Sequence, residues 1–171
     1  ILYQSGYQVQ GSDINKSNNT NRLEKLGIKV FIGQRKTNII NAKIIVISTA
    51  ISNTNEEFIA AKKLFIPIVH RSEMLGELMR LKQSIAIAGT HGKTTTTSLI
   101  AKMIEENGMD PTIINGGIIS SLDSNARLGN GEWMVVEADE SDGSFSKLNP
   151  TAAIITNIDL EHLDYHKNED N

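Results

Sequence analysis

A loop that combines two glycines, a lysine and consecutive threonines lies near the middle of the chain, between a short apolar run and a helical pattern. Its residues are Gly89, Thr90, His91, Gly92, Lys93, Thr94 and Thr95. Backbone N–H groups at the start of a helix, with the positive end of the helix dipole, bind phosphate groups. Lys93 adds a mobile cation, and Thr94 adds a hydroxyl for Mg²⁺. The loop is therefore predicted to bind the polyphosphate of a nucleotide.

The loop departs from the common phosphate-loop pattern G-x-x-x-x-G-K-[ST], in which two glycines are five residues apart. This chain has Ile87 where the first glycine is expected, and Gly89 precedes Gly92 by only three residues. Glycines between a strand and a helix can also serve a simple tight turn. A turn alone does not explain Lys93 followed by four threonines, so we interpret the loop as a variant phosphate loop.

A second group of polar residues follows the predicted strand at residues 133–136. Four carboxylates lie within residues 137–142, and Glu137 is the first of them. In parallel sheets the ligand crevice lies beyond the carboxyl ends of the strands, and Mg²⁺ takes one or two carboxylates together with phosphate oxygens. Glu137 is therefore the best-placed metal ligand, although a solvated acidic turn is the alternative interpretation of this cluster.

The predicted strand at residues 152–156 leads into a polar stretch that contains His162. A neutral imidazole binds metals and also moves protons, so His162 is a candidate to complete a metal site or to orient a carboxylate. A single histidine is more often a surface or hydrogen-bonded residue. His162 and His166 would share one helix face, which leaves a dinuclear metal site as a minor alternative.

The first half of the chain alternates short β-type runs with helical patterns. The predicted strands are residues 7–11, 29–32, 44–47 and 66–69, and the predicted helices are residues 18–26, 56–64 and a segment that Ser72 would cap. The β-branched run at residues 44–47 is typical of a strand buried on both faces. Strand and helix units that repeat in this way predict an α/β fold with a parallel sheet.

The domain boundary is predicted where the pattern restarts, between residues 82 and 83. Residues 1–82 are expected to form most of a Rossmann-like domain that lacks its first strand and its first glycine turn. Residues 83–171 are expected to form the opening part of a phosphate-loop α/β domain, with strands at residues 111–114, 133–137 and 152–156. A turn is predicted at Gly116 and Gly117.

Several polar residues in the first domain follow predicted strands and are candidate ligand contacts. Asp13 follows the first strand, Ser48 and Thr49 follow the β-branched run, and His70 follows the next strand together with Arg71. An acidic residue at such a position meets a ribose or sugar hydroxyl in Rossmann-type domains. Turn formation and helix capping are the alternative roles for these side chains.

Composition excludes several classes of partner. The net charge of −3 offers no excess of basic residues for a nucleic acid or a membrane surface. There is no cysteine, so neither a disulfide framework nor a thiolate metal site is available, and a reducing cytoplasmic location fits. No apolar stretch is long enough for a membrane span. The chain begins without methionine, and we expect it to be a piece of a longer protein.

Five motifs taken together closely resemble the Mur ligases of peptidoglycan synthesis. They are residues 89–97, 115–118, 125–129, 137–142 and 156–162. The resemblance covers essentially the whole chain, so residues 1–82 look like the UDP-substrate domain of this family, and residues 83–171 like the opening part of its central ATP-binding domain. Ile87 then reads as a mark of the family.

The resemblance implies ATP-dependent formation of an amide bond through an acyl phosphate. The motifs are most similar to those of the members that join L-alanine to UDP-N-acetylmuramate. On this basis Lys93 contacts the transferred phosphate, Thr94 and Glu137 hold one Mg²⁺, and Glu137 and His162 hold a second. Asp13, Ser48, Thr49 and His70 become candidate substrate contacts. No residue is a convincing base for the amine of L-alanine.

Two alternatives remain open at this point. One is the recycling ligase of the same family, which adds a preformed peptide to UDP-N-acetylmuramate, although Ser141 and the motif at residues 110–117 look more like the alanine-adding members. The other is a phosphate-loop ATPase or switch without ligase activity. The Rossmann-like domain in front of the loop argues against it, because that domain implies a second, nucleotide-linked small ligand. The 171 residues alone are expected to be inactive.

Overall fold

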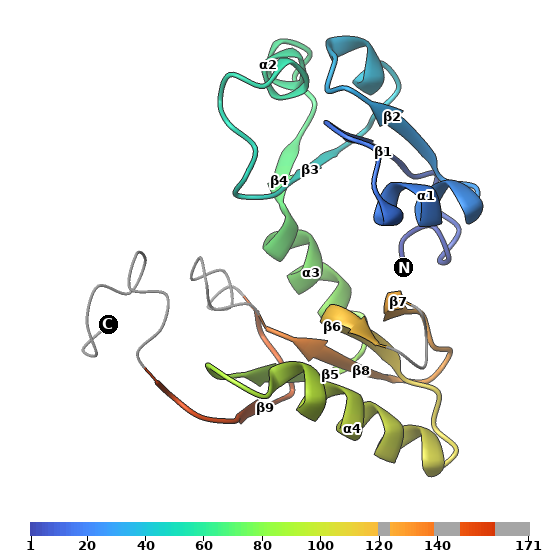
Figure 1. Ribbon diagram of the computed structural model, residues 1–171, viewed down its shortest axis with the longest axis vertical. Helices are drawn as coiled ribbons and strands as arrows, with labels where there is room; N and C mark the ends of the chain where they lie inside the picture. Colours follow the sequence, from blue (N-terminus) through green and yellow to red (C-terminus); the bar gives the residue numbers. More distant parts are fainter. Residues whose placement is uncertain (120–123, 139–147, 160–171) are drawn as a thin grey trace. The chain divides into compact units, whose positions relative to one another are not determined.

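The computed structural model describes residues 1–119, 124–138 and 148–159. The chain divides into two compact units, Ile1–Arg71 and Ser72–Asn171, and each is described by itself (Figure 1). The two units divide between residues 71 and 72, whereas the domain boundary was predicted between residues 82 and 83. That boundary stays a prediction. No helix in the described ranges has the length and apolar character needed to cross a bilayer.

The first unit contains two separate pairs of parallel strands. Strand β1 (Gln10–Asp13) pairs with β2 (Lys29–Ile32), and β3 (Ile45–Ile47) pairs with β4 (Ile68–His70). The helices are α1 (Asn18–Lys25), the 3₁₀ helix η1 (Lys36–Ile39) and α2 (Glu56–Lys63). The parallel strands with intervening helices confirm the predicted α/β class.

Local capping explains where the two α-helices of this unit begin. Ser17 and Thr20 form a capping box, in which the Ser17 hydroxyl accepts the Thr20 N–H at 3.3 Å and the Thr20 hydroxyl accepts the Ser17 N–H at 2.8 Å. The side chain of Asn55 accepts the N–H groups of Glu57 and Phe58. Such caps satisfy N–H groups that have no partner inside the helix. The local sequence therefore defines where α1 and α2 begin.

The β-branched run at residues 44–47 is less buried than we predicted. Ile44 is 44% exposed and Val46 is 41% exposed. Strand β3 hydrogen-bonds only to β4 within the described residues, so one of its edges and part of its faces stay open. β-Branched residues favour an extended backbone, so the run predicts a strand. The burial of that strand depends on the elements that pack against it, and the run does not specify them. The first strand, predicted at residues 7–11, is found three residues later as β1 (Gln10–Asp13).

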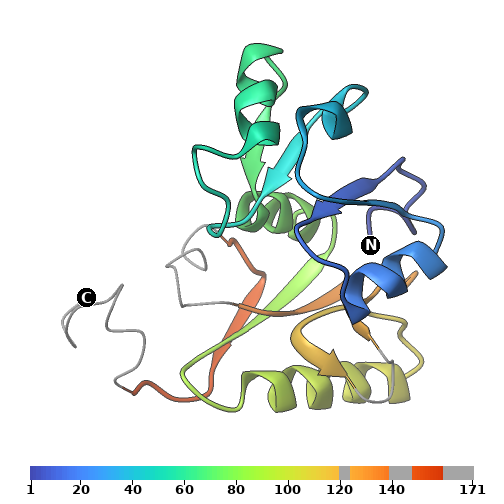
Figure 2. The ribbon, with the colours of Figure 1, turned by 45° about the horizontal axis from the view of Figure 1, so that its top comes forward.

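The second unit is built on a five-stranded sheet with the order β7-β6-β8-β5-β9 (Figure 2). Its strands are β5 (Gln83–Ala88), β6 (Thr112–Ile119), β7 (Ser124–Arg127), β8 (Trp133–Glu137) and β9 (Ala152–Ile155). Only β7 runs antiparallel to its neighbour. Helix α3 (Arg71–Met79) begins at the last residue of the first unit, and α4 (Lys93–Glu106) follows β5.

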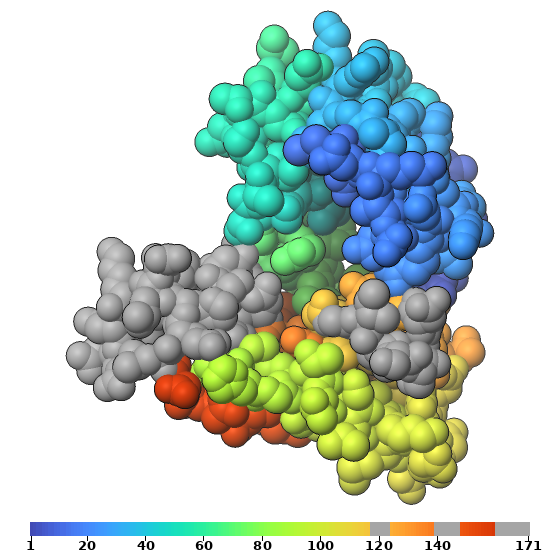
Figure 3. All heavy atoms as spheres, viewed as in Figure 1, coloured from blue at the N-terminus to red at the C-terminus, as the bar shows by residue number. Residues whose placement is uncertain are grey.

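Alternate side chains of the central strands build a core on each face of the sheet. On one face Ile87 and Val135 pack with Ala101 of α4, and on the other Ala86 and Val136 pack with Met79 of α3. Burial of one such aliphatic side chain contributes about 1.5–3 kcal/mol. The outer face of α4 is open to solvent (Figure 3), where Leu99 and Met103 are exposed. The two cores fix the strand that precedes the loop.

Two local predictions for this unit were wrong, and one strand was not predicted. Ser72 lies inside α3 as its second residue and does not cap the helix. Gly116 and Gly117 lie within β6, where we predicted a turn, because β6 continues along β7 with a register shift between Ile114 and Ile119. Glycine fits an irregular strand of this kind as well as a turn. Strand β7 itself was not predicted, since its polar residues show no alternation of apolar side chains.

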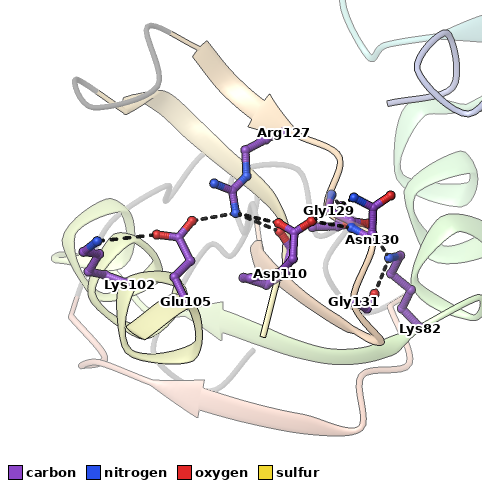
Figure 4. A network of polar contacts seen from close by, with 10 residues as sticks. Lys82, Lys102, Glu105, Asp110, Arg127, Gly129, Asn130 and Gly131 are labelled. Atoms are coloured by element: carbon purple, nitrogen blue, oxygen red, sulfur yellow. Dashed lines mark hydrogen bonds and ion pairs between the residues drawn. The ribbon is translucent and has the colours of Figure 1, made fainter. Parts of the chain in front are cut away.

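A network of polar contacts lies at the amino ends of β5, β6 and β8 (Figure 4). Oδ2 of Asp110 accepts the backbone N–H of Asn130 at 2.8 Å and its side-chain amide at 3.1 Å. Arg127 forms ion pairs with Asp110 and Glu105. Nζ of Lys82 donates to the carbonyl oxygens of Gly129 and Gly131. These contacts hold the segment between β7 and β8 against the chain that enters β6.

Candidate active site

The loop between β5 and α4 has the backbone conformation that a phosphate site requires. Gly89 and Gly92 adopt positive φ angles of 120° and 79°, a region that favours glycine. Gly92 is the N-cap of α4 and makes no side-chain cap hydrogen bond. Helix α4 therefore begins at the next residue, Lys93. Its positive end and first N–H groups lie directly at the loop, an arrangement that suits anions.

Lys93 lies over its own loop. Its Nζ donates to the carbonyl oxygens of Gly89 at 2.7 Å and Thr90 at 3.1 Å, and the side chain is half-buried. An ammonium group has three N–H donors on a flexible stem. These contacts hold the positive charge beside the N-terminus of α4, where it can neutralise a phosphate that the loop binds.

The carboxylate of Glu137 meets the loop helix at the carboxyl end of β8. Its Oε2 accepts the hydroxyl of Thr94 at 3.0 Å and the backbone N–H of Gly116 at 3.0 Å. A Cβ added at Gly116 would lie 2.8 Å from Oε1 of Glu137, so the absence of a side chain there admits the carboxylate. The structure thus brings together two of the predicted metal ligands, Thr94 and Glu137.

Asn115 is a site residue that sequence reasoning did not single out. It is 3% exposed, and its Nδ2 donates to the carbonyl oxygen of Thr94 at 3.4 Å and to the hydroxyl of Ser98 at 3.3 Å. Its Oδ1 is buried without a hydrogen-bond partner among the described residues. The signal available in the sequence was a polar residue directly after the apolar run Ile113–Ile114, at a strand position that faces the loop helix.

The segment that follows β9 contacts the loop through side-chain and backbone hydrogen bonds. The hydroxyl of Thr156 donates to the carbonyl oxygen of His91 at 2.6 Å, and the side chain of Asn157 pairs with the backbone of the same residue. A Cβ added at Gly89 would lie 2.3 Å from Oγ1 of Thr156. Gly89 therefore also serves a close approach of two backbone segments.

The donor groups at this sheet edge suit Mg²⁺. This ion prefers oxygen ligands and is held by one or two carboxylates with phosphate oxygens and water, and Thr94 and Glu137 supply a hydroxyl and a carboxylate. Within the ranges that the structure describes, no group of three or more His, Cys, Asp and Glu side chains forms a complete metal site by itself. The predicted ligand His162, like His166 and the carboxylates after Glu137, lies outside those ranges.

A cleft of about 550 Å³ in the first unit contains two of the four predicted substrate contacts. Asp13 and Ser48 line it, whereas Thr49 and His70 do not. Sequence reasoning missed Gln34 and Asn55, which also line the cleft. The other lining residues are Ser12, Ile14, Ala50, Ile51 and Ser52.

The cleft walls are held by hydrogen bonds between different elements. Nδ2 of Asn55 donates to Oε1 of Gln34 at 2.6 Å. The carboxylate of Glu57 accepts from Ser12 at 2.6 Å and from Asn38 at 2.7 Å. Because an amide carries both donors and an acceptor, Gln34 and Asn55 give the cleft lining both kinds of group.

Two family models match the chain on either side of residues 84–86. Residues 1–83 match the Mur ligase family, catalytic domain, and residues 87–171 match the Mur ligase middle domain. Sequence relatives include the UDP-N-acetylmuramate–L-alanine ligases of Parvibaculum lavamentivorans, 60% identical over 97% of this chain, and of Rhizobium etli, 57% identical over 99%. The chain spans 34% and 36% of these two proteins, about a third of their length.

Solved structures of the same family have closely similar folds. The UDP-N-acetylmuramate-alanine ligase of Thermotoga maritima is 33% identical with a TM-score of 0.90, over 98% of this chain and 40% of that one. The ligase of Neisseria meningitides for UDP-N-acetylmuramate and L-alanyl-gamma-D-glutamyl-meso-diaminopimelate is 28% identical with a TM-score of 0.87, over 96% of this chain and 57% of that one. The resemblance found in the motifs is confirmed by these independent matches: the chain belongs to the Mur ligase family.

Proposed function

We propose that residues 1–171 are part of an ATP-dependent ligase that joins L-alanine to the carboxylate of UDP-N-acetylmuramate. The observation that carries the proposal is the meeting of the phosphate loop, Thr94 and Glu137 at one sheet edge. The choice of L-alanine rests on relatives of 54–60% identity that are UDP-N-acetylmuramate–L-alanine ligases. The ligase would act in the synthesis of peptidoglycan precursors, and the cytoplasmic location stays a prediction.

The proposed reaction has two steps. A carboxylate oxygen of the muramate attacks the γ-phosphorus of ATP, the bond between that phosphorus and the β–γ bridging oxygen breaks, and ADP leaves. The amine nitrogen of L-alanine then attacks the acyl carbon, and the tetrahedral intermediate expels inorganic phosphate as the amide forms. The amine loses its proton to a base that the described residues do not identify.

The first step brings an anionic nucleophile to an anionic phosphate, so the site must neutralise charge. The loop N–H groups at the start of α4 bind the phosphate oxygens, and Lys93 adds a positive charge beside the transferred group. Thr94 and Glu137 would hold Mg²⁺, which offsets the negative charge of the phosphates when bound. Glu137 and His162 remain our proposed ligands of a second ion.

The cleft of the first unit is the proposed site for the UDP-linked substrate. Asp13 and Ser48 line that cleft and are its best-supported contacts. Thr49 and His70 remain proposals with less support, because they lie outside the cleft lining. The amides of Gln34 and Asn55 have the donors and acceptors that a polar nucleotide fragment needs.

Steady-state turnover of the full-length protein tests the function. We expect ligation that requires ATP, UDP-N-acetylmuramate and L-alanine together. Replacement of Lys93 by alanine should reduce kcat at least about 10³-fold, because electrostatic groups at the transferred phosphate contribute on this scale. Binding of UDP-N-acetylmuramate should be nearly unchanged. Lys102→Ala, which removes an exposed lysine from the same helix, is the matched control and should keep full turnover.

The same assay separates the alternatives. The similarity to the Neisseria ligase makes a peptide acceptor the second candidate, and faster turnover with the L-alanyl-gamma-D-glutamyl-meso-diaminopimelate tripeptide than with L-alanine would replace our assignment. ATP hydrolysis that continues without the UDP-linked substrate and forms no amide would instead favour an ATPase or switch. Equal turnover of Lys93→Ala and the unmodified protein would remove Lys93 from the mechanism.

A further inference from the structure

Residues 156–159, here called the loop clasp, form a set of hydrogen bonds to the phosphate loop. The side-chain amide of Asn157 makes two of them to one residue: its Oδ1 accepts the backbone N–H of His91 at 2.9 Å, and its Nδ2 donates to the carbonyl oxygen of His91 at 3.1 Å. This pairing copies the contacts that a neighbouring strand would make. Asn157 thereby satisfies both main-chain polar groups of a residue inside the loop.

The rest of the loop clasp restrains the adjacent residue. The carbonyl oxygen of Asn157 accepts the N–H of Thr90 at 3.2 Å. The hydroxyl of Thr90 donates to the carbonyl oxygen of Asp159 at 3.3 Å and accepts its N–H at 2.9 Å. The Thr90 hydroxyl is thus engaged by the clasp, so its contribution to nucleotide binding is to the shape of the loop.

The loop needs restraint from outside because of its glycines. Gly89 and Gly92 both have positive φ, and glycine loses more conformational freedom on ordering than any other residue. Binding of a phosphate requires that several N–H groups point to one place at the same time, and any loop ordering on binding reduces affinity. A clasp that fixes the loop beforehand removes this cost.

We propose that Asn157 is a positioning residue that holds the phosphate loop in its nucleotide-binding conformation through the paired hydrogen bonds to His91. The inference rests on the proposed function of the loop and adds a residue that supports it without contact to the nucleotide. The side-chain type is specific, because an amide has one donor and one acceptor group, whereas an ionised aspartate has acceptors alone. Aspartate at this position would keep the bond from the His91 N–H and repel the His91 carbonyl oxygen.

The test compares kinetic constants of the full-length protein and its Asn157→Ala and Asn157→Asp variants. Loss of two hydrogen bonds predicts an increase of about tenfold in the KM for ATP and in the Kd for a non-hydrolysable ATP analogue. The KM for UDP-N-acetylmuramate should stay within about twofold, since its proposed cleft lies in the other unit. Asn130→Ala is the matched control, because it removes an exposed side-chain amide at the opposite end of the sheet.

Thr90→Val and Thr90→Ser form a second, independent pair. Valine removes the hydroxyl that bonds to Asp159, and serine keeps it, so the KM for ATP should rise in the valine variant and return towards the unmodified value in the serine variant. This pair decides the question if Asn157→Ala does not fold. A serine variant as impaired as the valine variant would contradict the clasp.

The outcomes separate this inference from the proposed function. Unchanged ATP constants in Asn157→Ala, with Lys93→Ala still inactive, would overturn the positioning role and leave the function intact. An equal rise in the constants for both substrates, together with a lowered Tm, would also overturn it, because a general loss of structure would then explain the data. Absence of ATP-dependent ligation in the unmodified protein would instead reject the function itself.

Discussion

The two ends of the sheet in the second unit use polar residues in opposite ways. At the amino ends of the strands, Asp110, Arg127 and Lys82 bond to protein groups within one network (Figure 4). At the carboxyl ends, the N-cap Gly92 makes no side-chain cap bond and Asn115 keeps a buried Oδ1 without a partner in the described structure. Nε of Arg127 in the amino-end network is also buried without a hydrogen-bond partner among the described residues. The distinction therefore rests on the N-terminus of α4, which lies at the carboxyl ends of the strands and suits an anionic ligand.

The comparison shows that the same residue type serves stability or function according to where its hydrogen-bond partners lie. Asp110 and Glu137 are both carboxylates that accept a backbone N–H. Asp110 accepts from Asn130 within the network at the amino ends, whereas Glu137 accepts from Gly116 and from Thr94 beside the phosphate loop. Substitutions at one end should therefore change stability, and substitutions at the other should change catalysis.

The largest expected effect on stability comes from Gly129→Ala, in the network at the amino ends. A Cβ there would lie 2.3 Å from the carbonyl oxygens of Asp110 and Pro111. Backbone atoms cannot move aside as a flexible side chain can, so we expect a loss of about 3 kcal/mol or more in the free energy of unfolding. Denaturant unfolding measures it. The control is Gly11→Ala, which has open space at its Cβ position; similar losses in both variants would contradict the argument.

Gly116→Ala tests the other end and should affect catalysis while sparing the fold. The new Cβ would lie 2.8 Å from Oε1 of Glu137, which is the mobile end of a side chain and can move away. Movement of that carboxylate by about 1 Å from the Thr94 hydroxyl should lower kcat about 10²-fold. Turnover and Tm are measured together on the full-length protein. A large fall in Tm with proportionate loss of activity would remove the distinction between the two ends.

Sequence reasoning found the site residues whose type and spacing carry the chemistry. Lys93, Thr94 and Glu137 could be selected because a lysine and a threonine follow a glycine loop, and a carboxylate ends a buried strand. The pairing of Asn157 with His91 joins residues that are 66 positions apart, and it depends on β9 lying beside β5. No local pattern specifies that neighbour relation, so the clasp became visible only in the folded chain.

The parts of the fold that were predicted well have local determinants. The strand Lys29–Ile32 begins where we predicted, in a short run of β-branched and aromatic residues. The helix Glu56–Lys63 also has its predicted start, directly after the Asn55 cap. The misplaced turn at Gly116 and the overestimated burial at Val46 have a common cause. In both cases the outcome depends on which strand lies alongside, and a partner strand leaves no mark on the residues themselves.

Low pH should reduce the stability that the network at the amino ends of the strands contributes, because the folded protein favours the charged form of Asp110. The hydrogen bond from the backbone N–H of Asn130 holds the pKa of Asp110 below its ordinary value, with smaller contributions from the Asn130 side chain, Arg127 and Lys82. A carboxylate with a lowered folded-state pKa stabilises the fold above its unfolded pKa, and this contribution disappears as the pH falls through the folded-state pKa.

Asp110→Asn measures this contribution. The variant should be less stable than the unmodified chain at pH 7, and the difference should shrink as the pH is lowered from about 5 to below the ordinary aspartate pKa near 4. Urea midpoints at a series of pH values provide the measurement. Because other groups titrate in both proteins, their effects cancel in the difference. A difference that stays constant with pH would mean that Asp110 does not act through its charge.

The smallest effect is expected at Lys102, the exposed end of the chain of ion pairs that runs through Glu105 and Arg127 to Asp110 (Figure 4). The pair with Glu106, 2.7 Å long, raises the pKa of Lys102, so the lysine stays charged at neutral pH. Exposed pairs contribute little because water and salt screen them and two long side chains lose freedom. Lys102→Ala should therefore shift Tm by no more than about 2 °C, and this shift should vanish in 1 M salt. A larger loss of Tm that persists in 1 M salt would show that the ion-pair network stabilises α4 as well. Because α4 begins at the phosphate loop, the stabilising end and the ligand-binding end of the sheet would then not be separate.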